Sequence, residues 1–335
     1  MIAMKKILFS VVLCLLFAGC KQERLSGVFC DNHYVFEQFE DSAELKGELF
    51  LSESQNFGVE GILGLKDYLV FKFPERENLM SVYDKQGNHL KDFARKGRAR
   101  NEFHGVTFTG QYTGNKFVVN DINSSALKIV DLNKVLAGES DFVEKSFFTG
   151  GRCINAFCLS DPDVVYEQEI QDNFRLKIVD SRADTVKQQM DLYQPQPDAF
   201  RYYFSKTCIH PANTKLCFGM VRMNQINFLS LETMEKKSVS MYRDAEKQKE
   251  EIPEAWLYYG DVAADKDRVY ALYLNQSTED TFEVPMPREI HVFDWDGNPV
   301  KKLKVKEDIM YMWLDASSGY LYGADSKDEF YRYKL

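Results

Sequence analysis

A short segment recurs along the chain, and its spacing constrains the fold more than any other feature. The segment is a β-rich run that ends in a turn-forming residue, most clearly at 81–90 (SVYDKQGNHL) and 291–300 (HVFDWDGNPV). In both copies an aspartate is followed by a Gly-Asn pair and a second β-rich run. Weaker copies place Asp131, Asp180 and Ser230 at the same point. Such a repeat is typical of a fold built from equivalent units.

The spacing of these anchor residues gives the size of one unit. Asp84, Asp131, Asp180, Ser230 and Asp294 are 47, 49, 50 and 64 residues apart. Between them, short β-rich runs alternate with turn formers, four runs to a unit. Four strands in roughly 40–50 residues match a propeller blade, and one such sheet cannot bury both of its faces alone. The sequence therefore predicts an all-β fold, a six-bladed β-propeller over residues 28–335.

The sixth unit is one strand short. It contains β-rich runs at 311–314, 320–322 and 329–333. Residues 48–51 (ELFL) form a β-rich run that belongs to no unit, so we expect this N-terminal strand to close the last blade. The alternative is a two-sheet sandwich or two separate β-domains, which the absence of a linker between the six units disfavours.

The N-terminal residues predict export and a lipid anchor. Two lysines precede an apolar run over 7–17 that is too short to span a bilayer. Its continuation, LFAGC, resembles a bacterial lipobox, with Phe17 in place of the usual leucine. We expect a signal peptide over 1–19, a tether over 20–27 lipidated at Cys20, and a location in the cell envelope at the outer membrane. The alternative is an ordinary signal peptide with a chance cysteine.

The net charge bears on possible binding partners, and the cysteine content bears on disulfide bonds. The formal charge is −9, and because the first 20 residues hold two lysines and no acid, the remainder carries −11. An acidic surface repels phosphate backbones, so we expect no nucleic-acid partner. Five cysteines follow Cys20, an odd number, and we expect buried free thiols that pack as small hydrophobic side chains. These cysteines are Cys30, Cys153, Cys158, Cys208 and Cys217.

Residues 97–103 (GRARNEF) carry the most specific family resemblance. They resemble the Gly-x-Gly-Pro-Gly-Glu-Phe-type segment that joins the first two blades in the TolB-like six-bladed propeller lipoproteins of Gram-negative bacteria. Glu102 and Phe103 match this pattern, whereas Ala99 and Arg100 replace the second glycine and the proline. The resemblance covers most of the mature chain. It implies the fold and the anchor far more firmly than an activity.

The predicted topology also sorts the loops. In a four-strand meander, the second-to-third turns and the connectors between blades share one end, and long loops on a rigid scaffold tend to carry binding residues. That end receives arginines suited to carboxylates and phosphates and aromatic rings suited to sugar faces or peptides. The candidate ligand-binding residues are Arg76, Arg98, Arg100, Glu102, Arg201, Tyr202, Arg222 and Trp256. The alternative is scattered surface charge and strand core. A helix is expected at 244–251, stopped by Pro253.

Catalytic signatures are absent from the sequence. The five histidines are dispersed, and no His-Glu-x-x-His, Gly-x-Ser-x-Gly, phosphate-binding Gly-rich loop or calcium loop is present. We expect no cofactor and no metal, although a funnel metal held by Glu60, Glu102, Asn155 and Asp261 is an alternative. The prediction is a binding or scaffolding module for a glycan, peptide or envelope protein, attached to the membrane by its acyl anchor. The alternative is an extracytoplasmic hydrolase or lyase, which convergent acids and a perturbed histidine in the funnel would favour.

Overall fold

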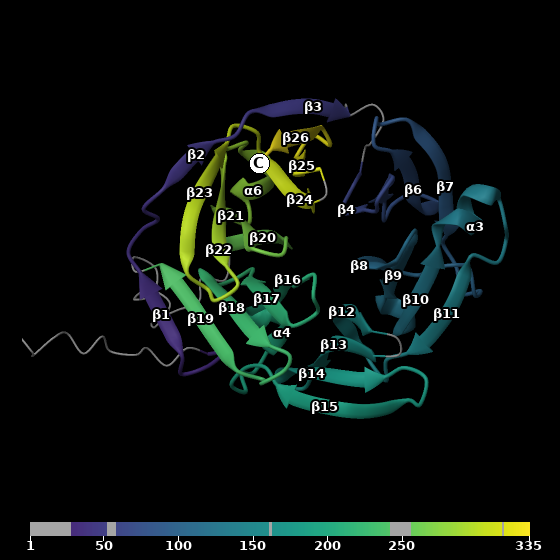
Figure 1. Ribbon diagram of the computed structural model, residues 1–335, viewed down its shortest axis with the longest axis horizontal. Helices are drawn as coiled ribbons and strands as arrows, with labels where there is room; N and C mark the ends of the chain where they lie inside the picture. The colour runs from purple at the N-terminus through teal and green to yellow at the C-terminus, as the bar shows by residue number, and fades with distance from the viewer. Residues whose placement is uncertain (1–27, 52–57, 161–162, 242–255, 317) are drawn as a thin grey trace, which may run out of the picture.

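Six β-sheets surround a common centre in the computed structural model (Figure 1), which describes residues 28–51, 58–160, 163–241, 256–316 and 318–335. Blade 1 consists of β4 (Gly61–Gly64), β5 (Tyr68–Lys72), β6 (Asn78–Asp84) and β7 (His89–Arg95). Blade 2 consists of β8 (Val106–Thr113), β9 (Lys116–Asp121), β10 (Ala126–Asp131) and β11 (Val143–Phe148). Blade 3 consists of β12 (Cys153–Ser160), β13 (Asp163–Ile170), β14 (Asn173–Asp180) and β15 (Thr185–Asp191).

The second half of the ring repeats this order. Blade 4 consists of β16 (Ser205–Ile209), β17 (Lys215–Met220), β18 (Gln225–Ser230) and β19 (Lys236–Met241). Blade 5 consists of β20 (Trp256–Ala264), β21 (Arg268–Ser277), β22 (Arg288–Asp294) and β23 (Pro299–Val305). Blade 6 consists of β24 (Ile309–Asp315), β25 (Tyr320–Asp325) and β26 (Phe330–Lys334). The first strand of each blade contacts the first strands of its neighbours, and β24 meets β4. The predicted six-bladed propeller is confirmed.

The recurring anchor residue forms the same turn in blades 1 and 5. Asp84 Oδ1 accepts hydrogen bonds from the backbone N–H of Gln86 and Asn88, and Asn88 Nδ2 donates to Asp84 Oδ2 at 2.8 Å. Asp294 repeats this arrangement with Asn298, whose Nδ2 lies 2.9 Å from Asp294 Oδ2. Such side-chain turns bring the third and fourth strands of a blade together. In blade 6, Asp325 accepts the same kind of backbone hydrogen bonds, from the N–H groups of Lys327 and Glu329, but its turn joins the second and third strands, β25 and β26.

The N-terminal segment closes the ring as predicted. Strand β3 (Gly47–Leu51) pairs antiparallel with β26 and supplies the outer strand of blade 6. The segment before it does more than the sequence indicated. Strands β1 (His33–Phe36) and β2 (Ser42–Glu44) pair parallel with β19 and β23 and add a fifth strand to blades 4 and 5. Figure 1 shows β1, β2 and β3 along the rim beside these three blades.

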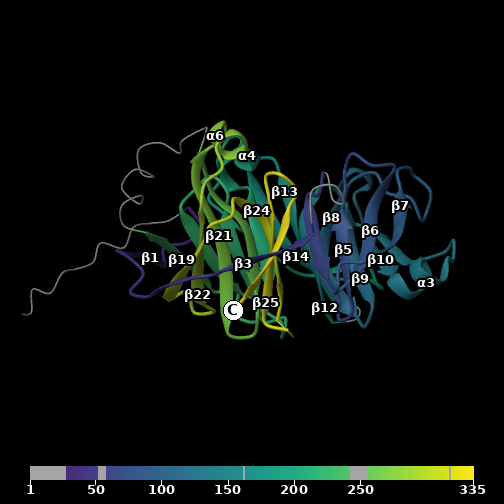
Figure 2. The ribbon, with the colours of Figure 1, turned by 90° about the horizontal axis from the view of Figure 1, so that it is seen from above.

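The two ends of the ring differ. The connector face comprises the connectors between blades and the second-to-third turns, such as 96–105, 192–204 and 277–288. It carries the short helices α4 (Ala199–Tyr203) and α6 (Asp280–Glu283), which lie at the same end in Figure 2, and the 3-10 helix η1 (Ile122–Ser124). The opposite end holds the tight anchor turns. In blade 2 that turn is replaced by helix α3 (Leu132–Ala137), whose first turn is capped by the anchor residue Asp131.

The hydrophobic core lies between neighbouring blades. At the junction of blades 1 and 6, Phe71 stacks on Phe330 with ring centroids 4.8 Å apart, and both side chains are buried. Beside them, the indole of Trp313 covers the backbone of Gly64, where a side chain would overlap the ring. This dense packing between the first and last blades holds the circle closed.

Several sequence predictions fall outside the described residues. They are the signal peptide, the tether, the lipidated Cys20 and the helix over 244–251. Within the described residues all five cysteines are free, three of them buried, which agrees with the expectation of unpaired thiols. No helix among those residues is long and apolar enough to cross a membrane.

Candidate functional site

A cavity of about 540 Å³ lies on the propeller axis. The innermost strands of the six blades line it, together with Arg152 and Phe200 from connectors and Ile122 from a second-to-third turn. These three residues belong to the connector face, so that face borders the cavity. The volume is within the range of pockets that enclose small ligands.

Two lysines bring positive charge into the cavity. Lys72, the last residue of β5, has its Nζ 3.4 Å from Glu60 Oε2, and burial lowers the pKa of Lys72 although Glu60 opposes this. Lys206 on β16 also lines the cavity. Its positive charge further lowers the pKa of Lys72, which means that the two ammonium groups are close enough to repel each other.

The second carboxylate in the cavity is held by backbone groups. Asp261 Oδ1 accepts from the N–H of Val262 at 2.9 Å, and Oδ2 accepts from the N–H of Met312 at 3.0 Å. Burial raises the pKa of Asp261, while Lys206 and these hydrogen bonds lower it. Because Asp261 lies on β20 and Met312 on β24, this carboxylate joins blades 5 and 6 at the cavity wall.

Cation–aromatic pairs form the wall of the cavity on the side of blades 3 and 4. The guanidinium carbon of Arg152 lies 4.6 Å from the ring centroid of Phe200, and Lys206 Nζ lies 5.9 Å from that of Phe204. All four residues line the cavity. A surface that combines cations with ring faces suits ligands with both an acidic group and a flat apolar face.

Four of the predicted binding residues lie at the ends of blades 3, 4 and 5. Arg222 Nη1 donates to Thr278 Oγ1 at 3.1 Å and to the carbonyl of Trp256 at 3.4 Å. Burial and the charge of Arg201 lower the pKa of Arg222, so the two arginines are near each other. Tyr202 lies beside Arg201, with its ring centroid 6.0 Å from the guanidinium carbon. The structure therefore brings these four residues to one part of the connector face.

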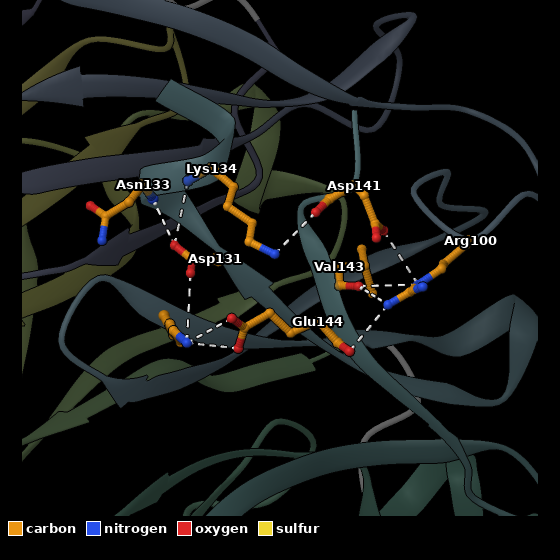
Figure 3. A network of polar contacts seen from close by, with 8 residues as sticks. Arg100, Asp131, Asn133, Lys134, Asp141, Val143 and Glu144 are labelled. Carbon is orange, nitrogen blue, oxygen red and sulfur yellow. Dashed lines mark hydrogen bonds and ion pairs between the residues drawn. The ribbon is translucent and has the colours of Figure 1, made fainter. Parts of the chain in front are cut away.

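The other four lie over blades 1 and 2. Arg100 binds the outer strand β11 (Figure 3): its Nη2 donates to the carbonyl oxygens of Val143 at 2.8 Å and Glu144 at 3.2 Å, and its Nε lies 3.5 Å from an oxygen of Asp141. Asn101 Oδ1 accepts from the N–H of Val143 at 2.8 Å. This loop covers the free backbone groups at the start of the blade's outer edge, which protects the edge from pairing with another strand.

The Glu-Phe end of that loop shapes the connector itself. Glu102 Oε2 accepts from the N–H of Ala99 at 2.9 Å, and its carboxylate occupies the space that a side chain at Gly97 would need. Phe103 is fully buried. Arg98 is exposed, and Arg76 lies over the ring of Phe73, 3.5 Å from its centroid. Glu102 and Phe103, the two residues that match the family pattern, thus have structural roles in this connector.

The funnel-metal alternative receives no support from the side-chain geometry. Glu60, Asn155 and Asp261 line the cavity, but Glu102 does not. Among the described residues, no group of three or more His, Cys, Asp and Glu side chains is arranged to hold a metal ion. Asn155 Nδ2 instead donates to Glu167 at 2.8 Å. Burial raises the pKa of Glu167 to about 7.

The sequence prediction missed the residues that reach the cavity from within strands. The sequence analysis gives no role to Lys72, Phe204 or Lys206, all of which line the cavity. The available signal was a lysine inside an apolar strand, as in Tyr68–Lys72, because such a residue is unfavourable in a core unless it is paired or reaches water.

Comparison with known proteins gives the family and the fold. A family model described as TolB-like 6-blade propeller-like matches residues 79–316. A member of the DUF4221 family from Bacteroides vulgatus is similar in structure, with a TM-score of 0.54 and 15% identity over 87% of this chain and 97% of that chain. A Bacteroides fragilis structure named "Putative exported protein" has a TM-score of 0.55 and 11% identity over 90% and 97%.

A third solved structure has a similar fold. Kuenenia stuttgartiensis hydrazine synthase has a TM-score of 0.53 and 10% identity over 83% of both chains. No curated protein matches the sequence. At these identities the structural similarities establish the fold alone.

Proposed function

The chain belongs to the TolB-like six-bladed propeller family, and from this premise we propose that it is an extracytoplasmic binding module held at the cell envelope by a lipid on Cys20. The signal-like residues 1–19 and the LFAGC sequence support export and lipidation. The name of the similar Bacteroides fragilis protein agrees with such an address. The outer membrane is the proposed site of attachment, and its acyl chains are the proposed membrane contact.

The ligand binds on the connector face, at the mouth of the axial cavity. The observation that carries this proposal is the set of cation–aromatic pairs at blades 3 and 4, formed by Arg152 with Phe200 and Lys206 with Phe204. Arg222 and Trp256 extend this surface toward blade 5. A glycan or a peptide with an acidic group fits such a surface, because rings contact its apolar face and cations its charge.

Over blades 1 and 2, the predicted residues contribute less to ligand binding. Arg100 and Glu102 already hold their own loop through hydrogen bonds, and Arg76 lies on Phe73. We therefore centre the proposal on the blade 3 to 5 side of the face. Arg98, which is exposed, would contact the ligand only if the ligand is long enough to reach from this side to blades 1 and 2.

A binding role is favoured over a hydrolase or lyase by the composition of the cavity. Its described lining residues include two carboxylates, Glu60 and Asp261, and no histidine. Glu60 pairs with Lys72, and Asp261 accepts hydrogen bonds from two backbone N–H groups, so both acids already have partners within the protein.

A thermal-shift screen tests the binding role. The mature protein would be heated with acidic oligosaccharides, neutral oligosaccharides and peptides, since a ligand that binds only the native state raises the melting temperature. We expect a shift with an acidic glycan or peptide that Arg222→Ala and Trp256→Ala reduce. Lys187→Ala on the outer strand β15 is the matched control and should leave the shift intact. A shift that none of the connector-face variants alters would refute the proposed face.

The lipid anchor has its own test. Expressed in a Gram-negative host, the full chain should enter the membrane fraction and incorporate labelled fatty acid. Cys20→Ser should abolish both. Membrane association that persists in this variant would exclude the acyl anchor.

A further inference from the structure

We propose that Lys72 and Lys206 form an anion-binding subsite inside the axial cavity, and that the ligand is a glycan whose terminal sugar carries a carboxylate. This inference rests on the proposed function and names the ligand class for the same site. It is argued from the charges, hydroxyl groups and rings that the six innermost strands bring together.

The path of Lys72 places its ammonium group at the axis. Lys72 lies on the second strand of blade 1, yet a Cβ atom at Gly61 on the innermost strand would lie in van der Waals contact with Lys72 Cε, at 3.8 Å. The lysine side chain therefore lies alongside Gly61 on its way to the cavity, which it lines.

The charges in the cavity leave one cation without a direct ion-pair partner among the described residues. Three cations line the described cavity wall, Lys72, Arg152 and Lys206, against the carboxylates of Glu60 and Asp261. Lys72 pairs with Glu60, and Arg152 pairs with Glu169 at 3.3 Å.

Lys206 has no such partner. No carboxylate oxygen of the described residues lies within 4.0 Å of its Nζ. The carboxylate of Asp261 is close enough to Lys206 for the two charges to interact, but it accepts two backbone N–H groups. In a chain with a net charge of −9, this ammonium, which lacks a direct ion-pair partner, is a local binding site for an anion.

The size of the free charge favours a carboxylate over a phosphate. A phosphate monoester carries about −1.5 to −2 charges at neutral pH, whereas a carboxylate carries one. Because Lys72 keeps Glu60 as its partner at 3.4 Å, the subsite offers little more than the one full charge of Lys206. A singly charged ligand matches it.

The rest of the lining suits a sugar. Hydroxyl side chains from Thr107 and Thr207 line the cavity and provide donors and acceptors for sugar hydroxyls. The rings of Phe200 and Phe204 flank them and offer flat faces for the sugar ring. A purely apolar ligand would leave the hydroxyl groups without a partner, and a purely ionic ligand would leave the aromatic rings without one.

Calorimetric titration of the mature protein with digalacturonate tests the subsite, and the matched neutral disaccharide of galactose is the reference ligand. We expect digalacturonate to bind at least about tenfold more tightly, because a hydrogen bond to a charged group is worth that much. Lys206→Met, which keeps the length of the side chain, should remove this preference. Lys206→Arg, which keeps the charge, should retain it, and Lys187→Met on β15 should change nothing.

Each outcome has a defined meaning. Equal binding of the acidic and neutral disaccharides, or an unchanged preference in a folded Lys206→Met variant, would overturn the inference. Tighter binding of a phosphorylated sugar would also overturn it. If a peptide or a neutral glycan binds and Arg222→Ala or Trp256→Ala weakens it while Lys206→Met does not, the binding function stands and only the acidic-sugar assignment fails. If no glycan or peptide binds, both proposals fail. Melting curves of the variants confirm that each is folded.

Discussion

Replacing Asp308 with alanine would leave a buried guanidinium without its counter-ion. Arg288, the first residue of β22, forms an ion pair with Asp308 in the connector before β24, and the two side chains are 1% and 6% exposed. Arg288 Nη1 also donates to Gln276 Oε1 at 2.6 Å, and Gln276 Nε2 donates to the carbonyl oxygens of Asp280 and Val284 beside α6. This network joins blades 5 and 6 to the loop that carries α6 on the connector face.

The expected loss of stability is large. Burial lowers the pKa of Arg288 and the carboxylate of Asp308 opposes that shift, so its removal leaves the charge with the desolvation penalty alone. Breaking a buried pair from one side costs about 3–5 kcal/mol. With an unfolding entropy of about 2.1 cal/mol/K per residue over roughly 300 residues, the melting temperature should fall by about 5–8 °C. Calorimetry and urea unfolding of Asp308→Ala measure both quantities.

Two further variants separate burial from charge loss. Glu77→Ala breaks the pair with Arg95, whose side chains are 73% and 68% exposed, and should cost less than about 1 kcal/mol. The double variant Arg288→Met/Asp308→Ala should be more stable than Asp308→Ala, because no charge remains buried. A loss below about 1 kcal/mol in Asp308→Ala, or a double variant less stable than the single one, would refute this reasoning.

Three other predictions concern packing, protonation and thiol reactivity. Gly64→Ala should lower the free energy of unfolding in urea by about 1–3 kcal/mol, because its methyl group would overlap the Trp313 indole; unchanged stability would show that the indole can move aside. Burial raises the pKa of Glu167 from 4.5 to about 7, so its protonated form stabilises the fold at low pH and this contribution is lost as the pH rises from 4.5 to 7. The free energy of unfolding of Glu167→Gln, measured in urea, should therefore rise by about 1–3 kcal/mol relative to that of the wild type as the pH is raised from 4.5 to 8. A difference between the two proteins that does not depend on pH would contradict the raised pKa. Cys153 and Cys217 are buried with raised thiol pKa values, so native alkylation followed by peptide mass spectrometry should find them unmodified until the protein is denatured; rapid labelling of either in the native protein would show that it is accessible.

Local turn chemistry explains why so much of the fold could be predicted. Asp84 and Asp294 make their turns with residues two to four positions away, so the same short sequence gives the same turn in different blades. Residues 48–51 were assigned to the last blade because that unit lacked a strand, and β3 confirms it. The parallel strands β1 and β2 could not be predicted in this way, since the four-strand count of blades 4 and 5 was already complete.

The candidate site was harder to predict because it depends on distance in space. The arginines of the connector face were predicted from topology. Topology assigns each loop to one end of the propeller, but it does not say which loops at that end lie next to each other. Arg201 and Arg222 therefore meet, whereas Arg100 lies on the outer edge of blade 2. Lys72 and Lys206, which we propose as the anion subsite, are separated by 134 positions in the sequence and carry no local motif.

The sequence by itself determined the blade as a unit, the number of blades and the strand that closes the ring. These properties follow from hydrophobic alternation and turn residues, which act over a few positions. The tertiary structure alone decided which side chains converge on the axis, that Lys72 on a second strand reaches the cavity and which acid accepts hydrogen bonds from backbone N–H groups. Ring closure sets those distances, because it places the innermost strands of all six blades around one cavity.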